Sequence, residues 1–108
     1  MNKIDSGKQE KRLAKLTGGR KTIASGAFSD KGDVETDLFL VECKITGNKS
    51  FRITLKDWDT IRIHALRKHK TGIMHLDISG TRLFVIPEFL LKEVEDALLH
   101  TSQTIQET

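Results

Sequence analysis

An apolar run at residues 38–41, LFLV, leads directly into Glu42, Cys43 and Lys44. A run of this length without Gly or Pro is typical of a strand that is covered on both faces in the middle of a sheet. Because side chains alternate along a strand, Glu42 and Lys44 are expected on one face and Cys43 on the other. Charged groups at the end of a core strand are costly unless they are paired or bind a ligand, so this pair needs a reason.

The rest of the pattern predicts helices and strands in a regular order. Apolar residues spaced three and four apart predict helices at about 7–16, 55–70 and 88–99, and short β-favouring runs predict strands at 20–24, 73–78 and 82–86. Capping signals mark the helix starts: Ser6 with Gln9, Thr54 with Asp57, and Pro87. With a strand near Asp33 and the strand after it, we expect an α/β domain whose mixed central sheet of about five strands is flanked by helices.

The length of 108 residues fits one domain with a modest core, over residues 1–99, followed by a polar tail, 100–108, that we expect to fray. The chain has no apolar stretch of 18 residues and no secretory signal pattern, which predicts a soluble, cytoplasmic protein without membrane contact. The single cysteine, Cys43, excludes an internal disulfide and a cysteine zinc site, and a small core residue is its expected role.

Charge is distributed unevenly around a net charge of +3. Residues 1–31 carry +5 and residues 51–72 carry +4, whereas residues 88–108 carry −4. Basic segments that flank an acidic motif would suit a phosphate-binding surface. Ordinary solvated lysines on helix faces are the alternative explanation.

Acidic residues at three places could share one site. Glu10 falls on the same helical stripe as Leu13 and Ala14, while the rest of that helix is basic. Asp33 lies on a segment that could pair beside the strand that contains Glu42. Carboxylates that hold a divalent cation, with a lysine close to a developing negative charge, suit metal-assisted hydrolysis of a phosphodiester. The alternatives are an exposed strand end with a solvated Glu and Lys pair, and a helix glutamate that pairs with a nearby lysine.

Asp33 followed by Glu42-Cys43-Lys44 resembles the PD-(D/E)XK nuclease signature, with Gly32 where that pattern often has proline. The resemblance covers residues 6–87 and implies a restriction-endonuclease-like core. It implies that Asp33, Glu42 and the backbone carbonyl of Cys43 bind one or two Mg²⁺ ions, for which Mn²⁺ could substitute. It further implies that Lys44 positions the attacking water or stabilises the transition state, and that Glu10 completes the site.

Ser25, in a Ser-Gly pair between Glu10 and Asp33, makes the chain similar to archaeal Holliday junction resolvases and related small phage nucleases, where such a serine helps cleavage. A small core without a recognition module favours DNA structure over base sequence, and a junction's two symmetric cut sites favour a homodimer. We therefore expect a Holliday junction resolvase that acts in DNA recombination. A nicking or flap nuclease and a non-catalytic DNA-binding module are the alternatives. Candidate phosphate contacts are Lys11, Lys15, Arg20, Lys21, Arg52 and Arg67.

Four other features receive weaker interpretations. Glu35 and Asp37 are expected to solvate a hairpin turn. Arg62 lies inside an apolar helix stripe, where it would face the site or a subunit contact. The four histidines show no spacing typical of a metal site, so we assign them no role. Nucleases of the resembled class often carry a glutamine on the second helix, and this chain has none there.

Overall fold

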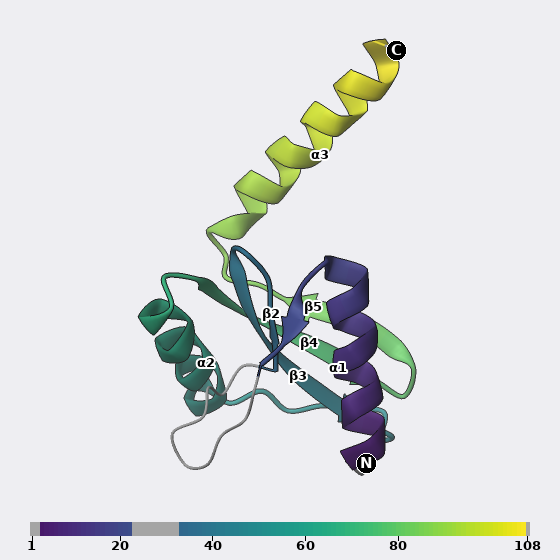
Figure 1. The fold of residues 1–108 in the computed structure, drawn as a ribbon, viewed down its shortest axis with the longest axis vertical. Helices are drawn as coiled ribbons and strands as arrows, with labels where there is room; N and C mark the ends of the chain where they lie inside the picture. The colour runs from purple at the N-terminus through teal and green to yellow at the C-terminus, as the bar shows by residue number, and fades with distance from the viewer. Residues whose placement is uncertain (1–2, 23–32, 108) are drawn as a thin grey trace.

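The computed structural model describes residues 3–22 and 33–107 (Figure 1), with side chains placed over 5–22 and 33–101. The elements follow the predicted order of helix, three strands, helix, two strands and helix. They are α1 (Lys3–Thr17), β1 (Arg20–Lys21), β2 (Val34–Glu35), β3 (Phe39–Thr46), α2 (Leu55–Arg67), β4 (Thr71–Ile78), β5 (Thr81–Val85) and α3 (Leu90–Glu107).

The five strands form one mixed sheet in the order β1-β2-β3-β4-β5. The central strands β3 and β4 are parallel, and every other neighbouring pair is antiparallel. Parallel neighbours need a crossover connection, and α2 supplies it. The sequence-based prediction of an α/β fold with a mixed five-stranded sheet is therefore confirmed. The restriction-endonuclease-like core stays a prediction.

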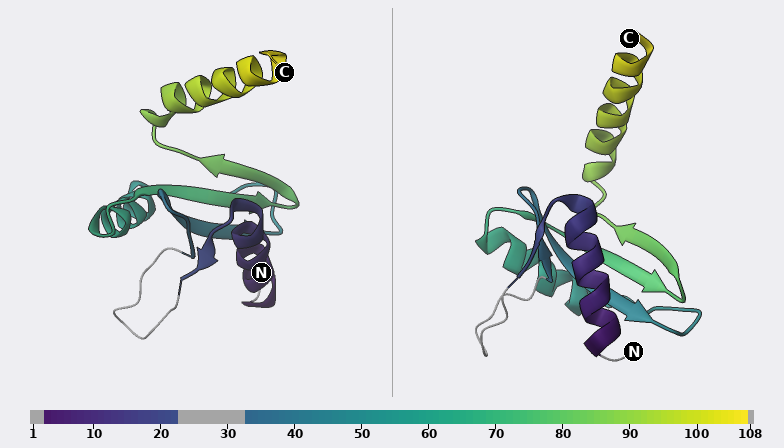
Figure 2. Two further views of the ribbon diagram at one scale, coloured as in Figure 1. Left: turned by 45° about the horizontal axis from the view of Figure 1, so that its top comes forward. Right: turned by 45° about the vertical axis from the view of Figure 1, so that its right-hand side comes forward.

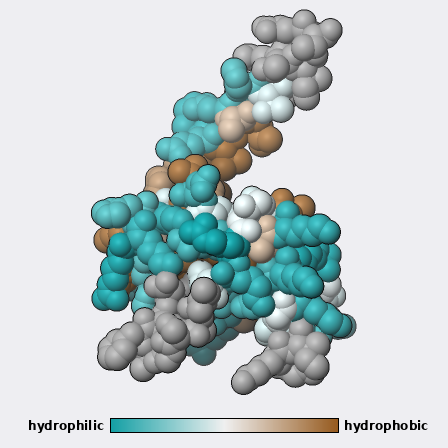
Figure 3. All heavy atoms as spheres, in the orientation of Figure 1, coloured by the Kyte–Doolittle hydropathy of each residue, from teal (hydrophilic) through white to brown (hydrophobic). Residues whose placement is uncertain are grey.

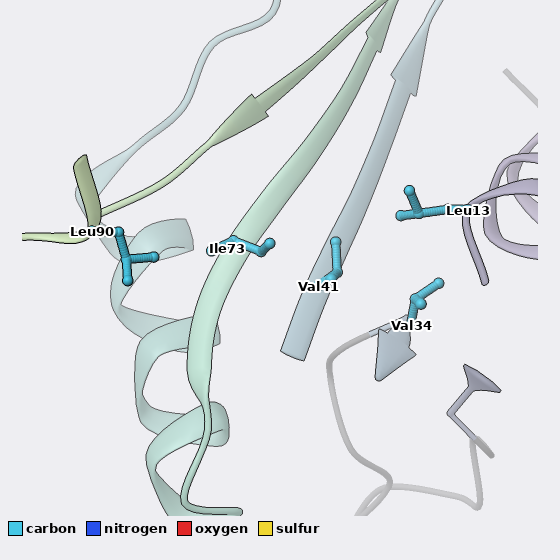
Figure 4. Packing of buried hydrophobic residues seen from close by; sticks show 5 residues of the cluster. All are labelled: Leu13, Val34, Val41, Ile73 and Leu90. Atoms are coloured by element: carbon cyan, nitrogen blue, oxygen red, sulfur yellow. The ribbon is translucent and has the colours of Figure 1, made fainter. Parts of the chain in front are cut away.

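Strand β3 is buried on both faces at Leu40 and Val41, as its apolar run predicted, and its remaining residues are partly exposed. Leu40 packs with the buried side chains beneath α2, whereas Val41 packs with those beneath α1. Figure 4 shows the second set as a row across the sheet, from Leu13 on α1 to Leu90 at the start of α3. Leu38, which we expected inside this strand, precedes it and is 70% exposed. The two helices thus cover opposite faces of the sheet.

Helix α2 begins with the predicted capping box. The Thr54 hydroxyl accepts a hydrogen bond from the Asp57 amide at 3.1 Å, and the Asp57 carboxylate accepts one from the Thr54 amide at 3.4 Å. The helix ends at Arg67 rather than at the predicted Lys70. The reason is local: His69 adopts a φ of 58°, and the amide of Lys70 turns back to the carbonyl of Ala65.

Helix α1 begins at Lys3, so the predicted start at residue 7 and the capping box of Ser6 with Gln9 are wrong. The stripe of Leu13 and Ala14 does face the sheet, as its spacing predicted. Gln9 is buried, because it bonds to the sheet instead of to the helix end.

Strands β4 and β5 form the expected hairpin through Ser79 and Gly80. Both residues have positive φ, 50° and 93°, which is the geometry of the two-residue turns that match strand twist. The carboxylate of Asp77 accepts a hydrogen bond from the Gly80 amide at 2.9 Å and fixes this turn.

Helix α3 differs most from prediction. It starts at Leu90, after a turn in which the Leu90 amide bonds to the carbonyl of Pro87, so Pro87 does not occupy the first helical turn. It continues to Glu107, although we expected a frayed tail from His100. Figures 1 and 2 show that α3 projects away from the sheet instead of covering it. In the described part of the chain, no helix combines the length and the apolar character needed to cross a membrane.

Candidate active site

The site forms where the short strand β2 stops beside β3. The Asp33 amide donates to the Val41 carbonyl at 2.8 Å, and the Asp33 carboxylate accepts from the Cys43 amide, also at 2.8 Å. In the described residues, β2 pairs with β3 only as far as Val41, so the carboxylate of Asp33 takes the amide that a longer strand would have bonded. Asp33 is thereby fixed against the backbone of the Glu42-Cys43-Lys44 segment.

Glu42 and Lys44 leave β3 on the same face, as the alternation of side chains predicted. Their side chains pair at 3.4 Å, and the Glu42 side chain is only 19% exposed. They line a small hollow of about 130 Å³ together with Asp57 and Thr60 from the first half of α2. The alternative of a solvated pair at an exposed strand end does not describe Glu42, which is largely withdrawn from water.

Glu10 approaches Asp33 from α1, on the other face of the sheet from the hollow. Its carboxyl group is close enough to that of Asp33 for the two charges to interact, and it pairs with Lys21 at 3.8 Å between Nζ and Oε2. Glu42 is close enough to both acids for their charges to affect its ionisation. Three acids from three separate elements therefore converge, with Lys21 and Lys44 beside them.

Burial and mutual repulsion make these acids hard to ionise together. Burial, followed by the charge of Asp33, raises the pKa of Glu42 to about 7. The same two causes raise the pKa of Glu10. Burial also raises the pKa of Asp33, against the opposing effects of the Cys43 amide, Glu10 and the two lysines. Such a cluster of carboxyl groups is typical of a functional site at which a positively charged ligand offsets the repulsion between the acids.

The cysteine in the middle of the motif is not a nucleophile. Burial, together with the charges of the neighbouring acids, raises the pKa of the Cys43 thiol. A thiol of that kind is not ionised at neutral pH and is therefore unreactive. Cys43 packs against the apolar cluster under α1, which is the core role that the sequence predicted.

The donor chemistry fits a hard divalent cation, because Asp33, Glu42 and Glu10 offer carboxylate oxygens. No group of three or more His, Cys, Asp and Glu side chains within the described ranges is already arranged as a metal cage. The acids instead pair with Lys21 and Lys44 and with one another. The ligand types thus suit Mg²⁺. Because Glu42 is ion-paired with Lys44, a bound cation would share the Glu42 carboxylate with that lysine.

Gln9, which sequence reasoning placed at a helix cap, anchors α1 beside the site. Its Nε2 donates to the Lys44 carbonyl at 2.9 Å and lies 2.9 Å from Nδ1 of His75. His75 is buried on β4, and its ring meets Phe84 edge-on. Since Gln9 precedes Glu10, this network holds the helix turn that presents Glu10. In the sequence, the polar Gln9 next to the inward-facing Glu10 was the signal that could have indicated this contact.

Glu35 is where the prediction fails most clearly. We expected it to solvate a turn, but it is buried in β2 and binds three basic groups: Lys70 at 2.7 Å, and Lys68 and Arg20 at 3.3 Å each. The hydrogen bond from Lys70 is the main cause that lowers the pKa of Glu35. The second turn acid, Asp37, is exposed as predicted.

The other predicted residues fall into three groups. Ser25 lies outside the described residues. Arg62 is exposed and pairs with Asp59 at 3.5 Å on its own helix, so it does not face the site. All six predicted phosphate contacts are exposed. Arg20 also pairs with Glu35 and Lys21 with Glu10, and the other four are Lys11, Lys15, Arg52 and Arg67.

We expect Glu42→Gln to stabilise the metal-free fold at pH 8. An acid whose pKa is raised on folding costs stability as pH rises from its unfolded value near 4.5 to about 7, and that cost persists above. Gln carries no charge, so the variant should exceed the wild type by about 2 kcal/mol at pH 8 and by less than about 0.5 kcal/mol at pH 5. Urea unfolding in EDTA measures this difference.

Asp59→Asn on α2, whose side chain is 44% exposed, is the control for that experiment and should change stability equally little at both pH values. A Glu42→Gln variant less stable than the wild type at pH 8 would show that Glu42 is stabilised by Lys44 more than it is penalised by burial. The electrostatic description of the site would then be wrong.

Comparison with protein-family models, with curated proteins and with solved structures gives no match. The function of the site is therefore argued from its own residues and their geometry.

Proposed function

We propose that this protein is a metal-dependent, structure-selective DNA endonuclease, of the kind that resolves Holliday junctions during recombination. The observation that carries the proposal is the convergence of Glu10, Asp33 and Glu42 from three elements, with Lys44 beside them. A structural role alone would favour apolar residues at this position, because buried and mutually repelling carboxyl groups lower stability. Such costs are typical of functional sites.

Asp33, Glu42 and the backbone carbonyl of Cys43 are the groups that would hold Mg²⁺, with Mn²⁺ as a substitute. The bound ion supplies an activated water and offsets the negative charge of the scissile phosphate. Asp33 is positioned for this by its hydrogen bond to the Cys43 amide. Glu10 would add a third carboxyl group, because it lies close enough to Asp33 for the two charges to interact.

Lys44 is the cation closest to Glu42 and is about one-third exposed, so its ammonium group can reach a phosphate from the site. In the proposed reaction it stabilises the extra negative charge of the transition state, which is electrostatic preorganisation. Ser25 is proposed as a helper of cleavage on the basis of the family resemblance alone.

The exposed cations supply the remaining contacts to DNA. Lys11 and Lys15 lie on α1, which also carries Glu10, and Arg67 lies at the end of α2. Contacts of this kind bind phosphates without reading bases, which fits selection by DNA shape. A four-way junction offers two equivalent strands to cut, so we propose that two copies act together on branched DNA.

We expect the full chain with Mg²⁺ to cut a labelled four-way junction at paired positions, and to cut a linear duplex of the same sequence at least about tenfold more slowly. Both substrates are incubated with protein under matched salt, with EDTA as the metal-free control. Equal nicking of the duplex would favour a nicking nuclease. Binding of the junction without any cutting would favour the non-catalytic DNA-binding module and overturn the proposal.

A further inference from the structure

The base of α3 borders an apolar groove on the sheet. The groove has a volume of about 620 Å³ and lies on the face of the sheet that α1 covers only in part. Val41 and Ile73 form its floor, and its walls come from the end of α1, the segment before β3, strand β5 and α3 itself. Large apolar side chains at its edge, Leu38 and Phe84, are exposed.

The apolar surface continues from the groove along α3. Leu91, Val94 and Leu98 follow the three- and four-residue spacing that places them on one stripe of the helix. Figure 3 shows hydrophobic residues gathered along α3 near the body. The exposed large apolar side chains of the groove edge and of α3 with its base are Leu38, Phe84, Phe89, Leu91, Val94, Leu98 and Leu99.

Nothing in the described part of this chain covers that surface. No other helix or strand packs alongside α3 beyond its base, although the helix is 18 residues long. Helices draw most of their stability from tertiary packing, and a helix of this length standing alone in water is marginal. A monomeric protein also rarely exposes a contiguous apolar patch of more than a few hundred Å². Both facts call for a partner along α3.

We infer that the partner is a second copy of this chain, with α3 of each copy packed into the groove of the other. Val94 belongs both to the groove lining and to the α3 stripe, so the two form one continuous apolar surface. In a twofold dimer the same surface of each copy contacts the other, so each copy would offer its helix and its groove at once. Seven side chains of this size bury on the order of 100 Å² each, close to the roughly 800 Å² per partner of a standard interface.

Charge supports the same partner. Residues 88–108 carry −4, and the chain as a whole carries +3, so the remaining residues carry +7. Net charge therefore favours the encounter of an acidic arm with the basic body of another copy, whereas the groove lining carries one charged residue, Asp37, and takes up the apolar stripe. This inference names the contact between the two copies in the proposed nuclease, but it does not depend on cleavage, because it rests on α3 and the groove alone.

Sedimentation equilibrium of the full chain tests it. We expect twice the single-chain mass of 12.2 kDa at micromolar concentration. Leu98→Glu on α3 and Leu38→Glu at the groove should each raise the dimer dissociation constant about 100-fold or more, because symmetry places each change in the interface twice. Both residues are exposed in the single chain, 64% and 70%, so circular dichroism should show the sheet and the other helices intact, with no loss of helicity beyond that of α3 without its partner.

Leu66→Glu is the matched control, because Leu66 is 65% exposed but lies on α2, outside the groove. It should leave the dimer intact. A wild-type chain that stays monomeric at 100 µM, as it would if the groove served another protein or a small molecule, would overturn the inference. Dissociation by Leu66→Glu as strong as by Leu98→Glu would overturn it too. A dimer that cuts no DNA would leave it standing while removing the proposed function.

Discussion

Glu42→Gln is expected to slow Mg²⁺-dependent cutting of a four-way junction by about 10³-fold or more. Gln keeps the size of the side chain but lacks the charge that would hold the cation. Asp33→Asn should have a similar effect, and its amide oxygen can still accept the hydrogen bond from Cys43. Single-turnover cleavage with protein in excess measures the rate.

Binding of the junction should survive both substitutions. Affinity for DNA comes mainly from cations that contact phosphates, and removing a negative charge near the backbone can only strengthen it. We therefore expect equal or slightly tighter binding in a gel-shift titration in Ca²⁺ or EDTA. Loss of binding together with cutting would point to a damaged fold rather than to a missing ligand.

Asp59→Asn, on α2 and outside α3 and the groove, serves as the control for charge removal and should cut at the wild-type rate. Cutting by Glu42→Gln at the wild-type rate would mean that the site assignment is wrong. Since Lys44 pairs with Glu42, Lys44→Met provides a second variant that removes the ammonium group but leaves the carboxylates. It should also reduce cutting.

The core of the site could be predicted because it depends on local regularities. Strand alternation puts Glu42 and Lys44 on one face, and helical spacing puts Glu10 beside Leu13 on the inner stripe of α1. The order of elements then brings Asp33 alongside β3. Each of these steps uses a period of two or three to four residues, which the sequence displays directly.

The features that were missed depend on contacts distant in sequence. Glu35 is two residues from Asp33 and is acidic like Asp37, yet it is buried because Lys68 and Lys70 arrive from the turn between α2 and β4. Gln9 is buried because of His75, 66 residues away. No local sequence pattern predicts such pairings, because a charged or polar residue looks the same in the sequence whether it is exposed or paired in the interior.

The length of α3 was missed for a related reason. Its last turns are polar, and a polar sequence at the end of a chain predicts a frayed tail when no partner is considered. The exposed stripe of Leu91, Val94 and Leu98 gives the helix an apolar side that a second copy could cover. The prediction of a frayed tail rested on the polarity of these last residues alone, which does not report how far a helix continues.

Glu35→Gln is expected to lower the free energy of unfolding by about 3 kcal/mol at pH 7, because it removes the carboxylate that pairs with Lys70 at a buried position. The Glu35 side chain is only 10% exposed, and Lys70, its closest partner, 13%. Lys70 also donates to the Thr36 carbonyl at 2.6 Å, so the same cluster ties β2 to the start of β4. Urea unfolding measures the loss.

The pH dependence of this effect is opposite to that of Glu42. Because the pKa of Glu35 is lowered in the folded state, its contribution is complete above the unfolded value near 4.5 and is lost as pH falls through the lower folded value. The difference between the wild type and Glu35→Gln should therefore shrink below about pH 4. Asp37→Asn, an exposed acid in the same connection, should cost less than about 0.5 kcal/mol at either pH. If Glu35→Gln were as stable as Asp37→Asn at pH 7, the buried cluster would not support β2, and the placement of Asp33 would need another explanation.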